Sequence, residues 1–311
     1  MKIRLGYVSI SKTLDISTSK TITYTEFIKN NDFNKLDNII KENLCNLEKI
    51  IDYNIKNNVH FYRLTSKLIP LATLEEVDFD YIEGYKDYYK RIGDKIKKYN
   101  IRVDTHPDQF CVLNSTKKEI VENSINILKY HYNILNALGI DKKVIILHIG
   151  SSVLGKYNSI KRFINNFNKL PNYLKKCIAL ENDDKIYNIK DCLDLCEFLN
   201  IPMVLDYHHH ICNNDGIDIN LYLKRIFNTW NDTPKMHFSS PKNKTKKDFR
   251  THHEYIDIDD FISFLDKIKL LNTNLDIMLE CKAKDEALFR LVRLLKYHDF
   301  EFIDETSFKL K

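Results

Sequence analysis

The sequence of 311 residues predicts an α/β fold, a single (β/α)8 TIM barrel. Eight short apolar runs alternate with eight longer segments in which apolar residues recur at helical spacing. The short runs are nearly continuous in apolar character, which is typical of parallel strands buried on both faces. No stretch rich in glycine and proline interrupts the alternation, so we expect one domain over residues 1–311.

A helix is expected after each predicted strand. In chain order the strands are RLGYVSI (4–10), VHFYRLT (59–65), IRVDTH (101–106), VIILHIG (144–150), CIALEN (177–182), MVLDYH (203–208), KMHFSS (235–240) and DIMLEC (276–281). The helices cover residues 36–58, 81–100, 115–139, 159–170, 189–200, 219–230, 258–272 and 285–298. The carboxyl-terminal segment HDFEFIDETSFKLK (298–311) follows neither pattern, and we expect it only to cap the barrel.

The composition is that of a water-soluble globular protein, with 43% hydrophobic and 29% charged residues. We expect a cytoplasmic location, because the amino terminus lacks a signal-peptide pattern and no apolar run reaches the roughly 18 residues of a membrane span. The net charge of +5 is too small to indicate nucleic-acid binding by itself. The cysteines have no CxxC spacing and are expected to be buried thiols; they are Cys45, Cys111, Cys177, Cys192, Cys196, Cys212 and Cys281.

Polar side chains mark the carboxyl ends of six consecutive predicted strands, where barrels of this kind carry their functional groups. These residues are Asp104 and His106, His148, Glu181, Asp206, His237, and Glu280. A lone histidine at a strand end is usually structural, but six strands that bring carboxylates and imidazoles to one rim would bury repelling charges unless cations neutralise them. The pattern therefore predicts a metal centre with more than one ion. Histidine and carboxylate ligands without cysteine favour Zn²⁺ or Mn²⁺ over Ca²⁺ or Mg²⁺.

Two positions stay open on the residues alone. The run His208 to His210 cannot supply three ligands to one ion, because successive side chains of an extended chain face opposite ways. Strict alternation favours His208, although the chain is leaving the strand there. Lys235, two residues before His237, points to the same side of its strand, where an ammonium is either repelled by metal ions or paired with a carboxylate.

Nine segments together resemble the UV damage endonuclease family, DNA-repair enzymes of the barrel superfamily that also holds endonuclease IV and xylose isomerase. They are RLGYVSI, FYRLTSKLIPL, DTHPDQFCVLNS, ILHIGS, ALENDD, LDYHHH, KMHFSS, THHEYID and LECKAK. The resemblance implies three divalent ions, commonly manganese with zinc as the alternative. It also implies incision of damaged double-stranded DNA 5′ to a lesion, with no membrane association and no obligate protein partner.

The resemblance also implies a ligand set. One ion takes His106, His148 and Glu181; Glu181 bridges to a second ion bound by Asp206, His237 and Glu280; a third takes His209 and His252. The Asp-x-x-His spacing of the family selects His209, with His208 as second choice. The His-x-acid-Tyr pattern selects His252, with His253 as the fallback. In the family the lysine at the place of Lys235 can be carboxylated.

The DNA contacts expected from the resemblance lie on the loops of the same rim. Gln109 and Phe110 are expected to probe the lesion and to wedge into the duplex, with Tyr7 assisting; a core role is the alternative for Phe110. Phosphate contacts are expected from the loop PKNKTKKDFR and from the end of the second strand, with Lys67 a weaker candidate. The residues concerned are Lys242, Lys244, Lys246, Lys247 and Arg250, and Arg63.

The expected chemistry is attack of a metal hydroxide on the phosphodiester, which leaves a 3′-hydroxyl and a 5′-phosphate. Glu181 and Glu280 are candidates to orient the attacking water, and Lys235 is placed with them as a catalytic candidate. An abasic-site endonuclease of the endonuclease IV kind is the first alternative. A sugar isomerase or epimerase on the same barrel is the second, and a DNA-binding barrel without catalysis the third.

Overall fold

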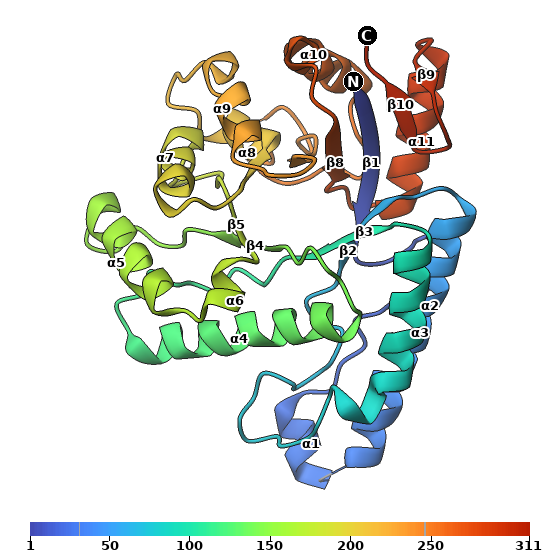
Figure 1. Ribbon diagram of the computed structural model, residues 1–311, viewed down its shortest axis with the longest axis vertical. Coiled ribbons are helices and arrows are strands. Elements are labelled where there is room, and N and C mark those ends of the chain that lie inside the picture. Colours follow the sequence, from blue (N-terminus) through green and yellow to red (C-terminus); the bar gives the residue numbers. More distant parts are fainter. Residues whose placement is uncertain (31, 246) are drawn as a thin grey trace.

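The computed structural model describes residues 1–30, 32–245 and 247–311, which form a closed barrel of eight parallel strands wrapped by helices (Figure 1). Strands β1 to β8 follow one another around the barrel, and β1 pairs with both β8 and β2 to close it. The predicted (β/α)8 barrel is confirmed. Each of the eight predicted strands is present, although most are shorter than the apolar runs that predicted them.

The strands are β1 Lys2–Val8, β2 Phe61–Leu64, β3 Arg102–Thr105, β4 Ile145–His148, β5 Ile178–Glu181, β6 Met203–Asp206, β7 Lys235–Phe238, β8 Leu275–Leu279, β9 Glu301–Phe302 and β10 Ser307–Lys309. The helices are α1 Tyr24–Asn30, α2 Phe33–Lys56, α3 Lys86–Lys98, α4 Lys118–Ala137, α5 Lys156–Lys169, α6 Asn172–Lys175, α7 Ile189–Leu199, α8 Tyr207–Cys212, α9 Leu223–Asn228, α10 Ile258–Ile268 and α11 Lys284–Tyr297. Short 3₁₀ turns at Glu83–Tyr85, Ile219–Leu221 and Lys269–Leu271 complete three of the predicted helical segments.

The barrel closes where β1 meets β2, and Gly6 makes this contact possible. A Cβ atom at Gly6 would lie 2.3 Å from the carbonyl oxygen of Phe61, so only glycine allows the two strands to approach. The upper part of β1 pairs with β2 through Tyr7↔Tyr62 and Val8↔Arg63. The lower part of β1 has a different partner, the carboxyl-terminal strand β10.

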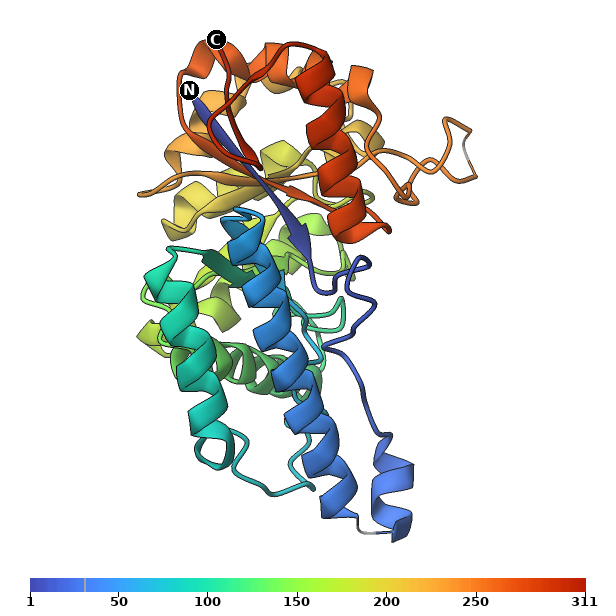
Figure 2. The same cartoon turned by 90° about the vertical axis from the view of Figure 1, so that its right-hand side faces the viewer.

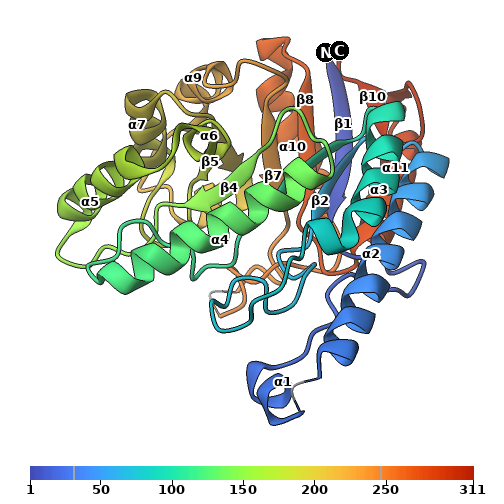
Figure 3. The same ribbon diagram turned by 60° about the horizontal axis from the view of Figure 1, so that its bottom comes forward.

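The carboxyl-terminal segment is a β-hairpin rather than a cap. Strand β10 runs antiparallel to β1, with Ile3 opposite the fully buried Phe308, and β9 pairs with β10 in turn. The two chain ends therefore lie side by side (Figure 3). Our expectation of a cap is corrected, because the segment completes the sheet in the gap between the lower halves of β1 and β2.

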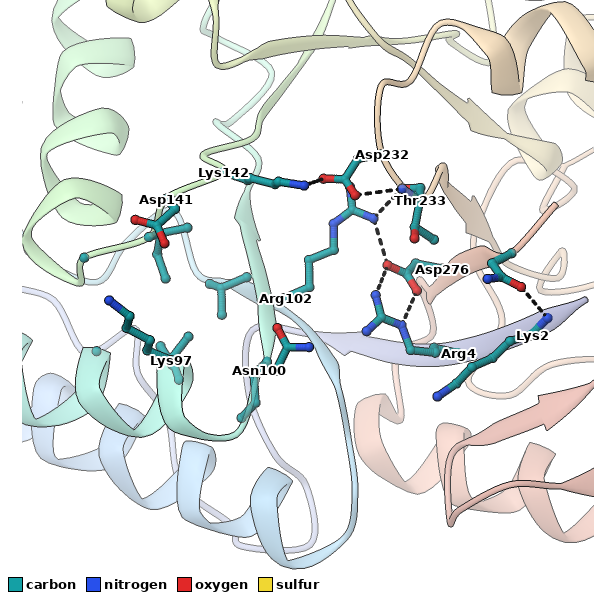
Figure 4. A pocket seen from close by; sticks show the side chains of 17 residues that line it. Lys2, Arg4, Lys97, Asn100, Arg102, Asp141, Lys142, Asp232, Thr233 and Asp276 are labelled. Atoms are coloured by element: carbon teal, nitrogen blue, oxygen red, sulfur yellow. Dashed lines mark hydrogen bonds and ion pairs between the residues drawn. The ribbon is translucent and has the colours of Figure 1, made fainter.

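An ion cluster occupies the amino-terminal end of the barrel. Asp276 on β8 is fully buried, and its carboxylate accepts hydrogen bonds from Arg4 Nε at 2.6 Å and from Arg102 Nη1 at 2.8 Å (Figure 4). Two guanidinium groups thus neutralise one buried carboxylate, which is the condition for burying it at all. The open cavity above this cluster is also lined by Lys97 and Lys142.

Long α2 forms one side of the helical layer. Asp32 accepts a hydrogen bond from the backbone N–H of Lys35 at 2.9 Å and so caps its first turn. Its buried residues recur every three or four positions and face the barrel. Figure 2 shows that α1 and the first turns of α2 extend beyond the barrel.

Two expectations from composition can be compared with the structure. All seven cysteines are free; five are buried, whereas Cys45 and Cys212 are half-buried. Among the described residues, no helix has the length and apolar character needed to cross a membrane.

Candidate metal centre

The register of the barrel places candidate ligands side by side at the carboxyl ends of the strands. His148 on β4 is the register partner of Glu181 on β5, and Asp206 on β6 is the partner of His237 on β7. In each of three overlapping groups, potential ligand atoms lie within 4.8 Å of one another. The groups are His106, His148 and Glu181; Glu181, Asp206 and His209; and Asp206, His237 and Glu280.

Glu181 lies at the middle of the centre, almost completely buried. Its Oε2 is 2.9 Å from His106 Nε2 and 3.9 Å from His148 Nε2. Its Oε1 is 3.1 Å from His237 Nδ1. Burial by itself would raise the pKa of Glu181, but the surrounding imidazoles, His237 and His148 foremost, hold it well below its usual range. Glu181 is therefore an anion shared between two groups of ligands.

The histidine run lies on a short helix, and this settles how its members point. Asp206 ends β6 and caps α8, because its Oδ1 accepts a hydrogen bond from the backbone N–H of His209 at 2.7 Å. On a helix, residues three apart share a face, so His209 stays near the Asp206 carboxylate, with Nδ1 3.8 Å from Oδ2. Alternation along an extended chain, which favoured His208, does not apply here.

His208, the second choice within the histidine run, lies outside the three groups of candidate ligands. The side chain of His208 is fully buried, with its ring 5.5 Å from that of His252 and 5.9 Å from that of Phe249. Burial lowers the pKa of His208 to about 4, so its imidazole is neutral at physiological pH.

Three candidate ligands are oriented by backbone carbonyls. The Nδ1–H groups of His106, His209 and His252 donate to the carbonyl oxygens of Pro107, Asn182 and Glu280 at 2.9, 3.0 and 2.9 Å. Histidines that bind metals commonly use one nitrogen in this way and keep the other for the ion. Each of the three rings therefore has Nε2 for a ligand. By contrast, Nδ1 of the fallback residue His253 accepts from the N–H of Tyr255 within its own loop.

His252 is not a member of the three groups, although its ring faces them. Its centre is 6.2 Å from the ring centre of His209, and both residues are half-buried. At this separation the two rings are neighbours at the same part of the site.

Arg63, which was predicted to contact a DNA phosphate, lies beside two of the candidate ligands. It is buried, its Nη1 donates to Glu280 Oε1 at 2.5 Å, and its Nη2 donates to His237 Nε2. The proton of the neutral His237 ring therefore lies on Nδ1, 3.2 Å from Glu280 Oε1, so His237 can bind an ion only if Arg63 releases Nε2 or the tautomer changes. The contact of Arg63 with a DNA phosphate stays a prediction, and because its guanidinium points into the site it would be made from there.

A second layer of charge lies beneath the ligands. Lys235 is fully buried and forms an ion pair with Asp104, whose Oδ1 is also 3.4 Å from Arg63 Nε. This pairing is the alternative in which a carboxylate partners the lysine. Burial lowers the pKa of the Lys235 ammonium to about 7. The sequence predicted Asp104 at the end of its strand, but it did not indicate that Asp104 would pair with Lys235 rather than bind an ion.

One buried oxygen left without a partner fits a divalent ion. Asp206 Oδ2 has no hydrogen-bond partner among the described residues. Burial raises the pKa of Asp206 to about 7 and lowers that of His237 to about 4. An unpaired buried carboxylate is costly, and a cation within reach of oxygen and neutral imidazole donors removes the cost. The donor set present thus suits the metal centre that the sequence predicted.

The expected lesion contacts are divided between surface and core. Gln109 and Phe110 are exposed, Phe110 to 73%, on the loop between β3 and α4. Tyr7 is fully buried, and its hydroxyl donates to Asn54 Oδ1 at 2.7 Å. The expectation that Tyr7 contacts DNA is corrected, because it is a core residue.

The basic loop extends from the rest of the molecule (Figure 2). Lys242, Lys244, Lys247 and Arg250 are exposed, and Lys246 lies outside the described residues. Arg250 is within 3.6 Å of Asp184, in the loop that follows Glu181. Lys67, the weaker candidate, is exposed on the loop after β2.

The fold and the site define a class, that of (β/α)8 barrels with a histidine and carboxylate centre at the carboxyl ends of the strands. A model of the family described as UV-endonuclease UvdE matches residues 3–309. The chain belongs to this family.

Individual relatives agree. The UV DNA damage endonuclease of Bacillus cereus (strain B4264) is 44% identical over 300 residues, which cover 94% of both chains. That of Bacillus anthracis (strain A0248) is 42% identical over 303 residues, 95% of both chains. Among solved structures, the crystal structure of SacUVDE superposes with a TM-score of 0.88 at 35% identity and covers 96% of this chain and 99% of that one.

A more distant likeness concerns the fold alone. Endonuclease IV from Thermus thermophilus superposes with a TM-score of 0.59 at 11% identity, over 94% of this chain and 99% of that one.

Proposed function

We propose that this protein is a metal-dependent DNA-repair endonuclease that nicks duplex DNA 5′ to UV photoproducts and related lesions. The observation that carries the proposal is the convergence of His106, His148, Glu181, Asp206, His237 and Glu280 on one buried centre, in a chain of the UV-endonuclease family. The relatives named UV DNA damage endonuclease support the substrate. The products would be a 3′-hydroxyl and a 5′-phosphate.

Three divalent ions, Mn²⁺ first and Zn²⁺ second, would be held by the eight candidate ligands. His106, His148 and Glu181 would hold one, Glu181, Asp206, His237 and Glu280 another, and His209 with His252 the third. Such ions lower the pKa of water towards neutrality and neutralise charge on a phosphate. No nucleophilic side chain is required.

The protein's own residues prepare this chemistry. Glu181 and Glu280 present carboxylate oxygens towards the site, where they would orient the attacking water. Arg63 holds Glu280 and His237 in place, and it is held in turn by Asp104. Rigid positioning of this kind supplies orientation that would otherwise cost entropy in the transition state.

Lys235 has a place in the proposal as the residue beneath the centre. With a pKa near 7, part of the population carries a neutral amine at physiological pH, and only a neutral amine can be carboxylated. Carboxylation would replace its pair with Asp104 by a repulsion, so we expect Asp104 to move or to take up a proton when it occurs.

Damaged duplex would lie over the same face. Phe110 and Gln109 would enter the duplex at the lesion, which kinks more readily than normal DNA. The lysines and Arg250 of the loop 242–250 would contact phosphates beside the centre.

The test is incision of three duplexes, one with a single cyclobutane pyrimidine dimer, one with an abasic site and one undamaged, each with Mn²⁺ and with chelator. Cutting immediately 5′ to the dimer, only with metal, is the expected result. Cutting of the abasic duplex alone would assign the protein to the endonuclease IV kind of activity. No cutting of any duplex would overturn the proposal and make the sugar isomerase the next activity to test.

A further inference from the structure

Four residues with strained backbone lie on the face that carries the candidate metal centre. Eleven described residues other than glycine have positive φ, and seven of them are Asn or Asp, which tolerate this conformation. The remaining four all follow carboxyl ends of barrel strands; they are Ser9, Leu71, Leu154 and Lys284. Strained backbone of this kind is found preferentially at functional sites.

Two of these four residues meet at one cavity beside the centre. Ser9 and Lys284 line a pocket of about 480 Å³ that also contains His106, His252 and Glu280 in its wall. The pocket opens where β1, β2, β3 and β8 end, and three candidate ligands form part of its wall. A group bound there would touch both the strained residues and the edge of the metal centre.

Lys284 occupies a position that is unfavourable in three respects. Its φ is +53°, a conformation that costs a long side chain about 1 kcal/mol or more. It is the first residue of α11, where the helix dipole favours acidic residues. It is half-buried, and burial lowers the pKa of its ammonium.

Local structure does not compensate these costs. The carboxylate that most favours its charge, Glu280, is already paired with Arg63 at 2.5 Å. The next residue, Asp285, is fully buried, and its carboxylate accepts hydrogen bonds from Ser11 Oγ at 2.7 Å and from the backbone N–H of Lys12 at 2.6 Å. Asp285 thereby fixes the start of α11 against the loop after β1. The Lys284 side chain is held at the pocket by this anchor, with an ammonium available for an external anion.

We propose that Lys284 is a positioning residue that binds a DNA backbone phosphate in this pocket, adjacent to the phosphodiester to be cut. The inference rests on the proposed function, because it takes duplex DNA as the ligand. An ammonium there would set the duplex relative to Glu280 and His106 without binding an ion itself. The strained backbone is the cost of pointing the side chain at the phosphate.

The experiment measures binding of the dimer-containing duplex to the full chain by fluorescence anisotropy, at several salt concentrations and in chelator so that nothing is cut. Lys284→Met should weaken binding about tenfold, and the slope of log Kd against log salt should fall by about one, as loss of one phosphate contact requires. Lys284→Arg should restore most of both. The matched control is Lys97→Met at the other end of the barrel, which should change neither (Figure 4).

A glycine variant separates this role from a structural one. Lys284→Gly relieves the positive φ, so it should unfold at or above the wild-type temperature while binding DNA as weakly as Lys284→Met. Unchanged affinity and salt slope in Lys284→Met and Lys284→Gly, with wild type cutting 5′ to the dimer, would overturn this inference alone. A wild type that neither binds nor cuts damaged DNA would overturn the proposed function as well.

Discussion

Asp206 performs two tasks with its two oxygens. Oδ1 accepts from the N–H of His209 and so begins α8, whereas Oδ2 has no hydrogen-bond partner in the part of the chain that the structure describes. The spacing Asp-x-x-His was legible in the sequence, and it selected His209. The structural reason for this spacing could not be predicted, because nothing in the run of three histidines indicates that a helix begins directly after the strand.

The raised pKa of Asp206, about 7, gives a pH-dependent prediction for the metal-free protein. A carboxyl whose pKa is raised on folding binds its proton more tightly in the folded state, so its contribution to stability falls as pH rises from about 4, the unfolded pKa, to about 7. Asp206→Asn has no proton to lose. We expect it to raise the unfolding temperature in chelator, more at pH 8 than at pH 5.

Thermal unfolding followed by circular dichroism measures this effect. Asp248→Asn, in the loop that ends near the site, is a control that should show no such pH difference. An equal shift at both pH values would contradict the assignment of a raised pKa to Asp206.

Glu181→Gln should remove the anion shared by two groups of ligands. Because Glu181 contacts His106, His209 and His237, the variant should bind fewer ions per chain and incise the dimer duplex more than about a hundredfold more slowly. Metal content by mass spectrometry and incision rate are the measurements. Glu197→Gln, on an exposed pair with Arg225, should match wild type. Full metal content with normal incision in Glu181→Gln would refute the ligand role.

At the scale of elements, the loops between strands and helices separate two functions. The register of the strands places the candidate ligands, whereas the loop from β3 to α4 carries exposed Phe110 and Gln109. The double variant Gln109→Ala, Phe110→Ala should therefore lose discrimination between dimer and undamaged duplex, about tenfold or more in the ratio of affinities, while metal content stays normal.

The matched control is Phe198→Ala, since Phe198 on α7 is 69% exposed and Phe110 is 73% exposed. Binding to both duplexes is measured side by side, together with metal content. Equal loss of metal and of discrimination in the double variant would show that the loop supports the centre and does not read the lesion.

The elements themselves were largely predictable, and the exceptions have physical causes. Apolar periodicity gave every barrel strand and the eight helices that follow them, because both patterns are local. Burial of Tyr7 and the inward turn of Arg63 depend on what lies opposite them, namely Asn54, Glu280 and His237. No single segment of sequence contains that information.

On the scale of the whole molecule, the barrel depends on its last residues. Strand β10 pairs with the first residues of β1, which do not pair with β2, and Phe308 of β10 is fully buried. The sequence could not show this, because a strand of three residues pairs with a segment about 300 positions away.

Phe308→Ala should accordingly lower the free energy of unfolding by about 3–5 kcal/mol, as loss of a buried aromatic ring does. Urea unfolding at fixed metal concentration measures it. Ile303→Ala, at a position 47% exposed in the same hairpin, should change the free energy by less than about 1 kcal/mol. A small effect at Phe308 would mean that β8 and β2 hold β1 without help from β10.

The base of the basic loop has a consequence for exchange of parts between related proteins. Pro241 and His252 form an antiparallel bridge, and the N–H of Lys242 donates to the carbonyl of Thr251 at 2.6 Å. The ring of His252 is fixed further, because its Nδ1–H donates to the carbonyl oxygen of Glu280, so the position of this candidate ligand does not depend on the rest of the loop. We therefore expect that segments of other lengths and charges, exchanged between positions 242 and 251, change the affinity for DNA and leave the position of His252 unchanged.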